Sequence, residues 1–317
     1  MKKPQDRSRW FWHGVYVLVI LAFGASLYIA SKRIDYTWRW ERLPEYVIST
    51  EGEEIRAPFD GFVEIFKDEK SLAVTEMKGA GRESYGGFSQ VLVGQGDLVF
   101  QNDVLARKPG IRPGPLLMGL WLTLKISAIS LVFALALGLV AGLGRVASNP
   151  AARNLAATYV EIIRGTPLLV QIFIFYFFIG TVLQLSAFTA GVAALSVFTG
   201  AYVAEIVRAG IEGVARGQME AARSLGMSYP QAMRYVILPQ ALRKTLPPLT
   251  GQFINLIKDS SLVSVMALTD LTKAGREVVS STFSPFEVWF CVAAMYLLLT
   301  GSLSLLVRHL EKRYAHE

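Results

Sequence analysis

The chain has 317 residues, of which 52% are hydrophobic and only 18% are charged, and its mean hydropathy is +0.39. Soluble globular domains carry about 25% charged residues, so this composition is typical of a membrane protein. The single cysteine and three scattered histidines exclude a disulfide framework, a multi-cysteine zinc site and catalysis by histidine. In a membrane chain the net charge of +7 bears on orientation rather than on nucleic acid.

Several apolar runs are long enough to cross a hydrocarbon core of about 30 Å as helices. They are 11–30, 116–143, 156–181, 187–207, 246–268 and 286–307, of which the fifth is diluted with polar residues. Basic residues precede the first run as in a signal peptide, but charged and aromatic sequence follows it instead of a convincing cleavage site. We therefore interpret the first run as a retained anchor.

Charge in the loops predicts the orientation of these runs. The link 208–245 is rich in arginine and has only Glu212 and Glu220 as acids, so we expect it in the cytoplasm. An even number of spans then places both termini in the cytoplasm. The predicted divisions are a tail with the first transmembrane helix at 1–31, an extracytoplasmic segment at 32–115, a transmembrane domain at 116–310 and a cytoplasmic tail at 311–317.

The outer segment has two parts. Trp38, Trp40 and Tyr46 among charges predict an interfacial helix, whereas 55–106 reads as short strands separated by glycines. The stretches 57–63 and 93–99 resemble the paired half-motifs of lipoyl-like, barrel-sandwich domains. Lys78 faintly resembles a modified carrier lysine but precedes the second half-motif, so we expect a small rigid β module for assembly or docking.

The segment 217–226 in the basic loop is too short and polar to span a membrane, and it predicts a surface helix. Ala221 and Ala222 give it a face of small side chains, and Gly226 can adopt the left-handed stop conformation. Ser228 then caps a second helix, with Gln231 at the reciprocal capping-box position, and Pro239 is expected to break that helix. The result is a stiff helix, corner and helix below the membrane.

This projection resembles the EAA loop of ABC-importer permeases in Glu220-Ala221-Ala222, Gly226 and Ile237-Leu238-Pro239. Three further motifs resemble the polar amino acid branch of that family. They are Arg164-Gly165-Thr166-Pro167-Leu168-Leu169-Val170-Gln171, Pro239-Gln240-Ala241 and Lys258-Asp259-Ser260-Ser261-Leu262. The resemblance covers about 116–311 and leaves about 47–115 as an unusual insertion.

The resemblance implies both a fold and a set of partners. The fold would be all-α and polytopic, with the five-span core of an ABC type I importer, one extra N-terminal span and a small extracytoplasmic β-rich insertion. In the bacterial inner membrane the chain would contact lipid and pair with a second permease, identical or homologous. Two ABC ATPase subunits and an extracytoplasmic amino-acid-binding protein would complete an importer that moves polar amino acids by alternating access.

The resemblance also implies that the first loop helix docks on the ATPase and transmits its closure, whereas the simpler reading is an ordinary surface helix. The residues that match the family's loop are Gly217, Gln218, Glu220, Ala221, Ala222, Leu225 and Gly226. The sequence has no Gly-x-x-x-x-Gly-Lys-Ser/Thr phosphate loop. We therefore expect a transporter subunit without enzyme activity or a cofactor of its own, with ATP and Mg on the partner.

Ionisable residues in membrane spans usually face a bundle interior or an aqueous path. Glu161 with Arg164, and Glu205 with Arg208, can pair on one helix face, in a structural or a gating role. Pro167 and Gly165 favour a bend beside Arg164. The candidate gate comprises Glu161, Arg164, Gly165, Thr166, Pro167 and Gln171.

A second polar group lies deep in the fifth run and consists of Asn255, Lys258, Asp259, Ser260 and Ser261. Its opposite charges and hydroxyl groups complement a zwitterionic amino acid, so it is a candidate substrate path. The alternative is a fixed network that holds the helix end or the dimer. Gly138, Gly142 and Gly144 are expected to let helices pack closely.

Three other functions remain open from the sequence. The same machinery could carry an opine or another small zwitterion, because the residues do not specify the cargo. The chain could instead be a membrane-anchored scaffold whose β module is the working part. A channel or an ion-driven carrier is a third possibility, although the sequence has no pore-loop signature or inverted halves.

Overall fold

The computed structural model describes residues 5–33, 36–49, 54–66, 71–77, 79, 81–88, 90–108 and 110–314, with the side chains of 5–9 and 308–314 left out. The chain divides into two units, Met1–Glu41 and Arg42–Glu317. The first unit holds helix α1, Gln5–Arg33, whose part Trp10–Arg33 is long and apolar enough to cross a membrane.

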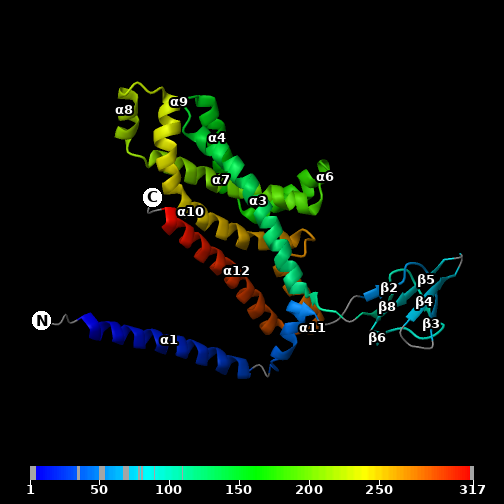
Figure 1. Cartoon of the computed structure of the whole chain (residues 1–317). Coiled ribbons are helices and arrows are strands. Elements are labelled where there is room, and N and C mark those ends of the chain that lie inside the picture. The colour runs from blue at the N-terminus through cyan, green and yellow to red at the C-terminus, as the bar shows by residue number, and fades with distance from the viewer. Residues whose placement is uncertain are drawn as a thin grey trace. The chain divides into compact units, whose positions relative to one another are not determined.

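The second unit is mainly helical (Figure 1). Its helices are α2 Leu43–Val47, α3 Pro115–Arg145, α4 Pro150–Arg164, α5 Leu168–Phe173, α6 Gly180–Val182, α7 Ala187–Glu212, α8 Arg216–Ser224, α9 Tyr229–Ala232, α10 Leu238–Asp259, α11 Leu271–Thr282 and α12 Pro285–Tyr314. Turns of 3-10 helix lie at Trp40–Arg42 and Ser260–Val265, and turns of π-helix at Ile174–Ile179 and Met233–Ile237.

The structure differs from the sequence prediction in two of the expected spans. The run 156–181 is not one helix, because Pro150–Arg164 and Leu168–Val182 meet at an angle of 103°. The run 246–268 is also interrupted, since α10 ends at Asp259 and Ala267 has a φ of 56°. In the described residues, α1, α3, α7 and α12 are each long and apolar enough to span, and the bent pair adds a fifth span only if counted as one.

Pro239 does not break the helix that begins at Ser228, contrary to the sequence prediction. Helix α9 continues through the π-helical turn Met233–Ile237 into α10, and Pro239 lies in the first turn of α10. A proline has no N–H to donate, and a π-helical turn shifts the hydrogen-bond partners there. The corner is therefore followed by one long helical arm.

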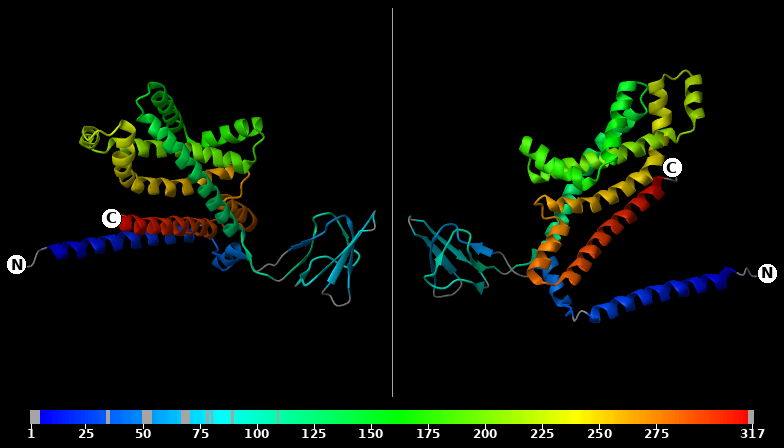
Figure 2. Two further views of the ribbon diagram at one scale, coloured as in Figure 1. Left: turned by 45° about the horizontal axis from the view of Figure 1, so that its top comes forward. Right: turned by 180° about the vertical axis from the view of Figure 1, so that it is seen from behind.

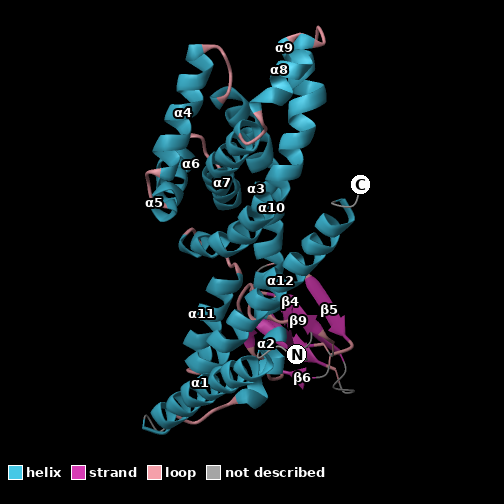
Figure 3. Cartoon of the chain, turned by 90° about the vertical axis from the view of Figure 1, so that its left-hand side faces the viewer, coloured by secondary structure: helices cyan, strands magenta, loops and turns pink. Residues whose placement is uncertain are grey.

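The insertion between α2 and α3 folds into short strands, coloured magenta in Figure 3. One antiparallel sheet has the order β5-β4-β3-β7 and the other β2-β8-β6. The strands are β2 Glu54–Arg56, β3 Gly61–Ile65, β4 Ser71–Glu76, β5 Arg82–Gly86, β6 Gln90–Val91, β7 Leu98–Val99 and β8 Val104–Arg107. Both sheets contribute to one buried cluster that includes Val63, Leu72 and Leu105. Lys78 lies outside the described residues.

The two ends of the insertion leave the helical core at one point. Strand β1, Ile48–Ser49, pairs with β9, Arg112–Pro113, and Gly114 N donates to Val47 O at 2.8 Å. A Cβ at Gly114 would lie 2.5 Å from the carbonyl carbon of Tyr46, so only glycine fits this crossing. We refer to the β2–β8 part as the β module and to the β1–β9 pair as its neck.

This neck predicts that the β module can be removed without unfolding the helical core. Replacing 50–111 with Asn-Gly would convert β1 and β9 into a tight hairpin, for which a two-residue Asn-Gly turn is favoured. We expect the shortened protein to elute as one species in detergent and to keep the thermal midpoint of its helical core. Aggregation of the shortened protein would show that the β module supports the core.

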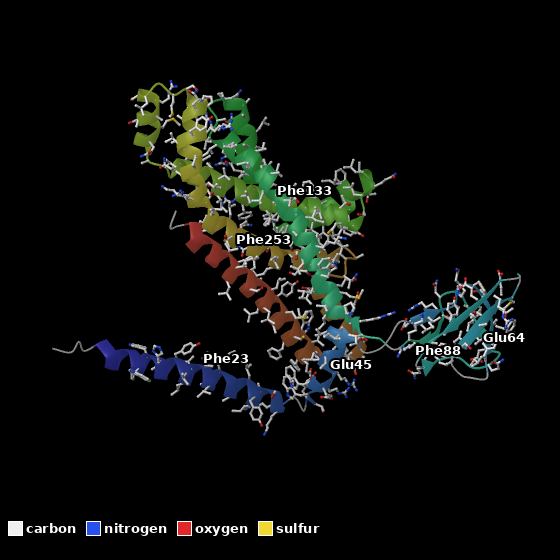
Figure 4. The ribbon with its side chains drawn as sticks, in the orientation of Figure 1. Phe23, Glu45, Glu64, Phe88, Phe133 and Phe253 are labelled. Carbon is white, nitrogen blue, oxygen red and sulfur yellow. The ribbon has the colours of Figure 1, made fainter. Side chains whose placement is uncertain are left out.

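The helical core packs through leucine and isoleucine side chains and through glycines. Ile126 of α3, Leu168 of α5, Leu195 of α7 and Leu256 of α10 lie in one buried cluster. Phe253 of α10 packs against this cluster, whereas Phe133 of α3 is 57% exposed, and both side chains are labelled in Figure 4. An exposed Phe on a long apolar helix is suited to face lipid or a partner subunit.

Candidate functional site

Helix α8 and the corner after it form the projection predicted from the sequence. Figure 2 shows α8 beside the start of the α9–α10 arm. Its side chains divide into a buried anchor and an exposed face. Met219 packs against a cluster made by Ile211 at the end of α7, Val214 of the link after it, and Ile237 and Ala241 of the arm. The end of α7, helix α8 and the start of α10 thus form one packed block, which we call the loop block.

Polar contacts also fasten the loop block. Gln240 Nε2 donates to Gln218 Oε1 at 3.2 Å, and Lys244 Nζ donates to the carbonyl oxygen of Gly213. The second contact ties α10 to the link between α7 and α8. These contacts join α8 and the link before it to α10 in addition to the apolar packing.

The corner has the local geometry that the sequence predicts. Gly226 has a φ of +85°, and Met227 N donates to Ala222 O at 3.2 Å. Ser228 and Gln231 form a reciprocal capping box, in which Ser228 N donates to Gln231 Oε1 at 2.8 Å. A left-handed glycine followed by a capped helix fixes the direction in which the chain turns.

Most of the predicted coupling residues are accessible to a partner. The exposed ones are Gly217, Gln218, Glu220, Ala221, Leu225 and Gly226. Leu225, the residue after the end of α8, is 82% exposed and is therefore accessible to a partner. Ala222 differs from the others, because it is 3% exposed and packs within its own chain. The small side chain of Ala222 therefore allows close packing within the loop block and is not available to a partner protein.

The candidate gate is the sharp bend between α4 and α5. Gln171 is 4% exposed, and its Nε2 donates to Ile163 O at 2.7 Å and to Thr166 Oγ1 at 2.8 Å. Thr166 Oγ1 in turn donates to Ile162 O at 3.0 Å. These bonds satisfy carbonyl groups at the end of α4, where Pro167 cannot continue the helical pattern. The bend is a braced corner rather than a flexible hinge.

The charged residues beside the bend pair differently from the prediction. Arg164 lies 3.7 Å from Glu205 on α7, whereas the sequence predicted a pair with Glu161 on its own helix. Glu205 also lies 3.8 Å from Arg145 and is hydrogen-bonded to Arg208, as predicted for the latter. Three arginines from three helices thus surround one carboxylate. Only the spacing of Glu205 and Arg208 carried a signal in the sequence, because the other two contacts are tertiary.

The candidate substrate path lies at the end of α10. Asn255, Lys258 and Asp259 are at helical spacings of three and four residues, so they share one face, and Asn255 and Lys258 are exposed. Ser260 is buried and donates to Ile257 O at 2.8 Å, so its hydroxyl group is bound to its own helix. Ser261 is half-buried. Three polar side chains are therefore grouped, and Ser260 is not directed toward a ligand.

A buried polar group was missed by the sequence analysis. Asp270 caps α11 by accepting from Thr272 N and Lys273 N, both at 3.0 Å, and Tyr296 OH of α12 donates to its Oδ2 at 3.4 Å. Thr123 of α3 joins this group by accepting from Leu271 N at 3.1 Å. The signal was the capping pattern of an Asp before a helix. Among the described residues, no group of three His, Cys, Asp or Glu is placed to hold a metal ion.

The fold and the loop together define a class of protein. Long apolar helices with an exposed polar projection are typical of a polytopic membrane protein. Residues 134–316 match the family described as binding-protein-dependent transport system inner membrane component, and the chain belongs to this family.

Relatives and solved structures agree with this assignment. The chain is 45% identical over 196 residues to the probable glutamine ABC transporter permease protein GlnM of Bacillus subtilis (strain 168), covering 62% of this chain and 91% of the relative. It is 41% identical over 203 residues to the glutamine transport system permease protein GlnP of Escherichia coli (strain K12), covering 63% and 93%. The crystal structure of an amino acid ABC transporter with histidines shares 42% identity with a TM-score of 0.58, covering 63% of this chain and 94% of that one.

A structure of the MetNI methionine ABC transporter, at 21% identity and a TM-score of 0.57, supports the fold alone. The prediction of an ABC-importer permease with a type I importer-like helical fold is confirmed, and the chain is an integral membrane transporter subunit rather than an enzyme. Because the matched relatives are covered over more than nine-tenths of their length, they have little room for a β module.

Proposed function

We propose that the chain imports polar amino acids, with glutamine as the first candidate, by alternating access. The observation that carries this proposal is the 41–45% identity to glutamine permeases across more than nine-tenths of their length. In this mechanism ATP binding closes the ATPase pair, α8 follows, and the helices open outward to receive the substrate. After ATP hydrolysis the helices return to the inward-open state and release the substrate into the cytoplasm.

The partners belong to the same proposal. The permease pairs with a second one, two ATPase subunits carry the ATP and Mg, and an extracytoplasmic amino-acid-binding protein delivers the substrate. Both termini and the loop 208–245 lie in the cytoplasm, and the segment 32–115 lies outside. The basic residues of that loop and the exposure of α8 support this orientation.

The proposal assigns substrate contact to Asn255, Lys258 and Asp259. Lys258→Gln and Asp259→Asn each remove a charge that complements the carboxylate or the ammonium group of an amino acid. We expect each change to raise the KM for uptake about tenfold, since a hydrogen bond to a charged group contributes about 1.5–3 kcal/mol. The measurement is uptake at varied concentrations of binding protein loaded with glutamine.

Lys273→Gln is the matched control for these two variants, because Lys273 is a charged residue of α11 that pairs with Glu277 at 3.8 Å and is not a member of the polar group on α10. Uptake by this control should equal that of the unchanged protein. An unaltered KM in both α10 variants would instead assign Lys258 and Asp259 to helix-end structure.

Reconstitution tests the proposed function as a whole. The permease, its ATPase and its binding protein would be placed in proteoliposomes, and the uptake of labelled glutamine would be compared with that of other amino acids and an opine. ATP-dependent glutamine uptake supports the proposal. Uptake of the opine alone would show that the substrate is an opine and not glutamine. A folded complex without any uptake would favour a membrane-anchored scaffold.

A further inference from the structure

The charged cluster around Glu205 joins the ends of several helices, which a pair of Glu205 and Arg208 within α7 would not do. Its arginines come from three helices, since Arg145 is the last residue of α3, Arg164 the last residue of α4, and Arg208 lies near the end of α7. Cations at helix C-termini are favoured by the helix dipole, but several of them close together repel one another. One carboxylate therefore offsets the repulsion among three arginines at helix ends that a buried apolar cluster of Ala141, Val160, Ala201 and Ala204 also packs together.

The contacts of Glu205 are of two kinds. Arg208 is hydrogen-bonded to Glu205 and also to Glu212, so it keeps a carboxylate partner if Glu205 is lost. The 3.8 Å and 3.7 Å separations from Arg145 and Arg164 are those of ion pairs, too long for hydrogen bonds. The guanidinium of Arg164 also lies 5.3 Å from the centre of the Tyr202 ring. Arg164 is thus held on α7 by contacts that can form and separate without breaking a helix.

The ion pair of Arg164 and Glu205 joins two tightly bonded parts of the chain, the bend between α4 and α5 and the loop block. On one side is the braced bend, where Gln171 holds the backbone of Ile163 and Thr166 and where Arg164 directly precedes Gly165. On the other side is the loop block, in which Ile211 of α7 and Val214 of the following link pack with Met219 of α8. Glu205 lies on α7 about two turns before its end at Glu212. The loop block and the bend are thus joined through α7, by this carboxylate and by the apolar contacts of Val160 and Ile163 with α7.

We propose that Glu205 is a positioning residue that couples the loop block to the bend at 165–167 by holding Arg164. This inference rests on the proposed transport function and extends it, because it names the link between the ATPase-facing helix and the candidate gate. In this role Glu205 acts through Arg164 and not by binding a ligand. Its contribution is to make the end of α4 follow the end of α7.

The first test measures the number of glutamine molecules imported per ATP hydrolysed in proteoliposomes. Glu205→Gln keeps the shape of the side chain and removes its charge, and Arg164→Gln removes the other end of the pair. We expect each variant to lower this ratio about tenfold, within the usual range of coupling between sites. The double variant should be no worse than either single variant, because both remove the same link.

Glu212→Gln is the matched control, since Glu212 pairs with Arg208 within the same helix, is about half exposed and does not reach α4. Its ratio of import to hydrolysis should not change. A merely structural role of Glu205 would lower the amount of folded complex and leave the ratio of the remaining protein unchanged. That result, or independent and additive losses in the double variant, would overturn the proposal.

A second measurement does not depend on the identity of the substrate. Spin labels at Leu169→Cys on α5 and Tyr235→Cys on the arm, both exposed positions, would be placed in a Cys291→Ser background of the assembled complex. ATP binding should change the distance between the labels in the parent, and Glu205→Gln should abolish most of that change. An unchanged response in Glu205→Gln would overturn the coupling role even if glutamine proved to be the wrong cargo.

Discussion

Replacing Leu225 with aspartate is expected to abolish uptake and to release the ATPase from the purified complex. The side chain is 82% exposed, so it contributes little to the folding of this chain and is available to a partner. Burying a leucine against a partner contributes about 1.5–3 kcal/mol, and burying a charge in its place costs more. We expect affinity for the ATPase to fall by at least about 100-fold, measured as the ATPase retained on the immobilised permease.

The matched control for Leu225→Asp is Tyr235→Asp. Tyr235 is 64% exposed in the same polar loop, but it lies on the arm and not on α8. This variant should keep its ATPase, so that a general effect of negative charge in the loop can be separated from loss of docking. Retention of the ATPase by folded Leu225→Asp protein would remove α8 from the coupling surface.

The variant Gly226→Asp tests the geometry of the turn after α8, whereas Leu225→Asp tests the contact with the ATPase. Its φ of +85° lies in the left-handed region, where a residue with a Cβ is strained by about 1–2 kcal/mol, although Asp tolerates it better than most. No atom lies within 4 Å of the position of a Cβ there, so steric overlap does not add to the strain. The helices should still form, but the angle of α8 should change and uptake should fall.

Local features of the loop were predictable from the sequence because their causes are local. A glycine that stops a helix, and Ser228 with Gln231 three residues later, specify a corner whatever the rest of the chain does. The presence of a bend beside Arg164 was predicted from the sequence, but its angle of 103° was not. That angle depends on Gln171, whose amide bridges backbone groups on the far side of the proline.

The features that the sequence analysis missed are tertiary. Glu161 and Arg164 have the spacing of an intrahelical pair, yet Arg164 is drawn to Glu205 because α4 crosses α7 there. Ala222 belongs to a family motif and was expected to face a partner, but packing of α8 on the arm buries it. Both errors follow from reading one helix at a time, which gives spacing along a helix and no information about its neighbours.

The close approach of α3 to α7 was predicted from glycines, and it leads to the largest expected loss of stability. A Cβ at Gly138 would lie 2.5 Å from Val203 Cβ and 2.8 Å from Gly200 O. Neither atom is the far end of a flexible side chain, so the helices must move apart. We expect Gly138→Ala to lose about 1–3 kcal/mol of stability, the usual cost of overpacking, and Gly138→Leu to leave little folded protein.

Gly301→Ala on α12 separates this overlap from the general effect of replacing glycine in a helix. A Cβ at Gly301 would have no atom within 4 Å, and alanine favours a helix over glycine by about 1 kcal/mol. This control should therefore match or exceed the thermal midpoint of the parent in detergent, while Gly138→Ala melts at a lower temperature. Equal midpoints for the two variants would mean that α3 and α7 can separate freely, and the coupling assigned to Glu205 would then lack the rigid helices it needs.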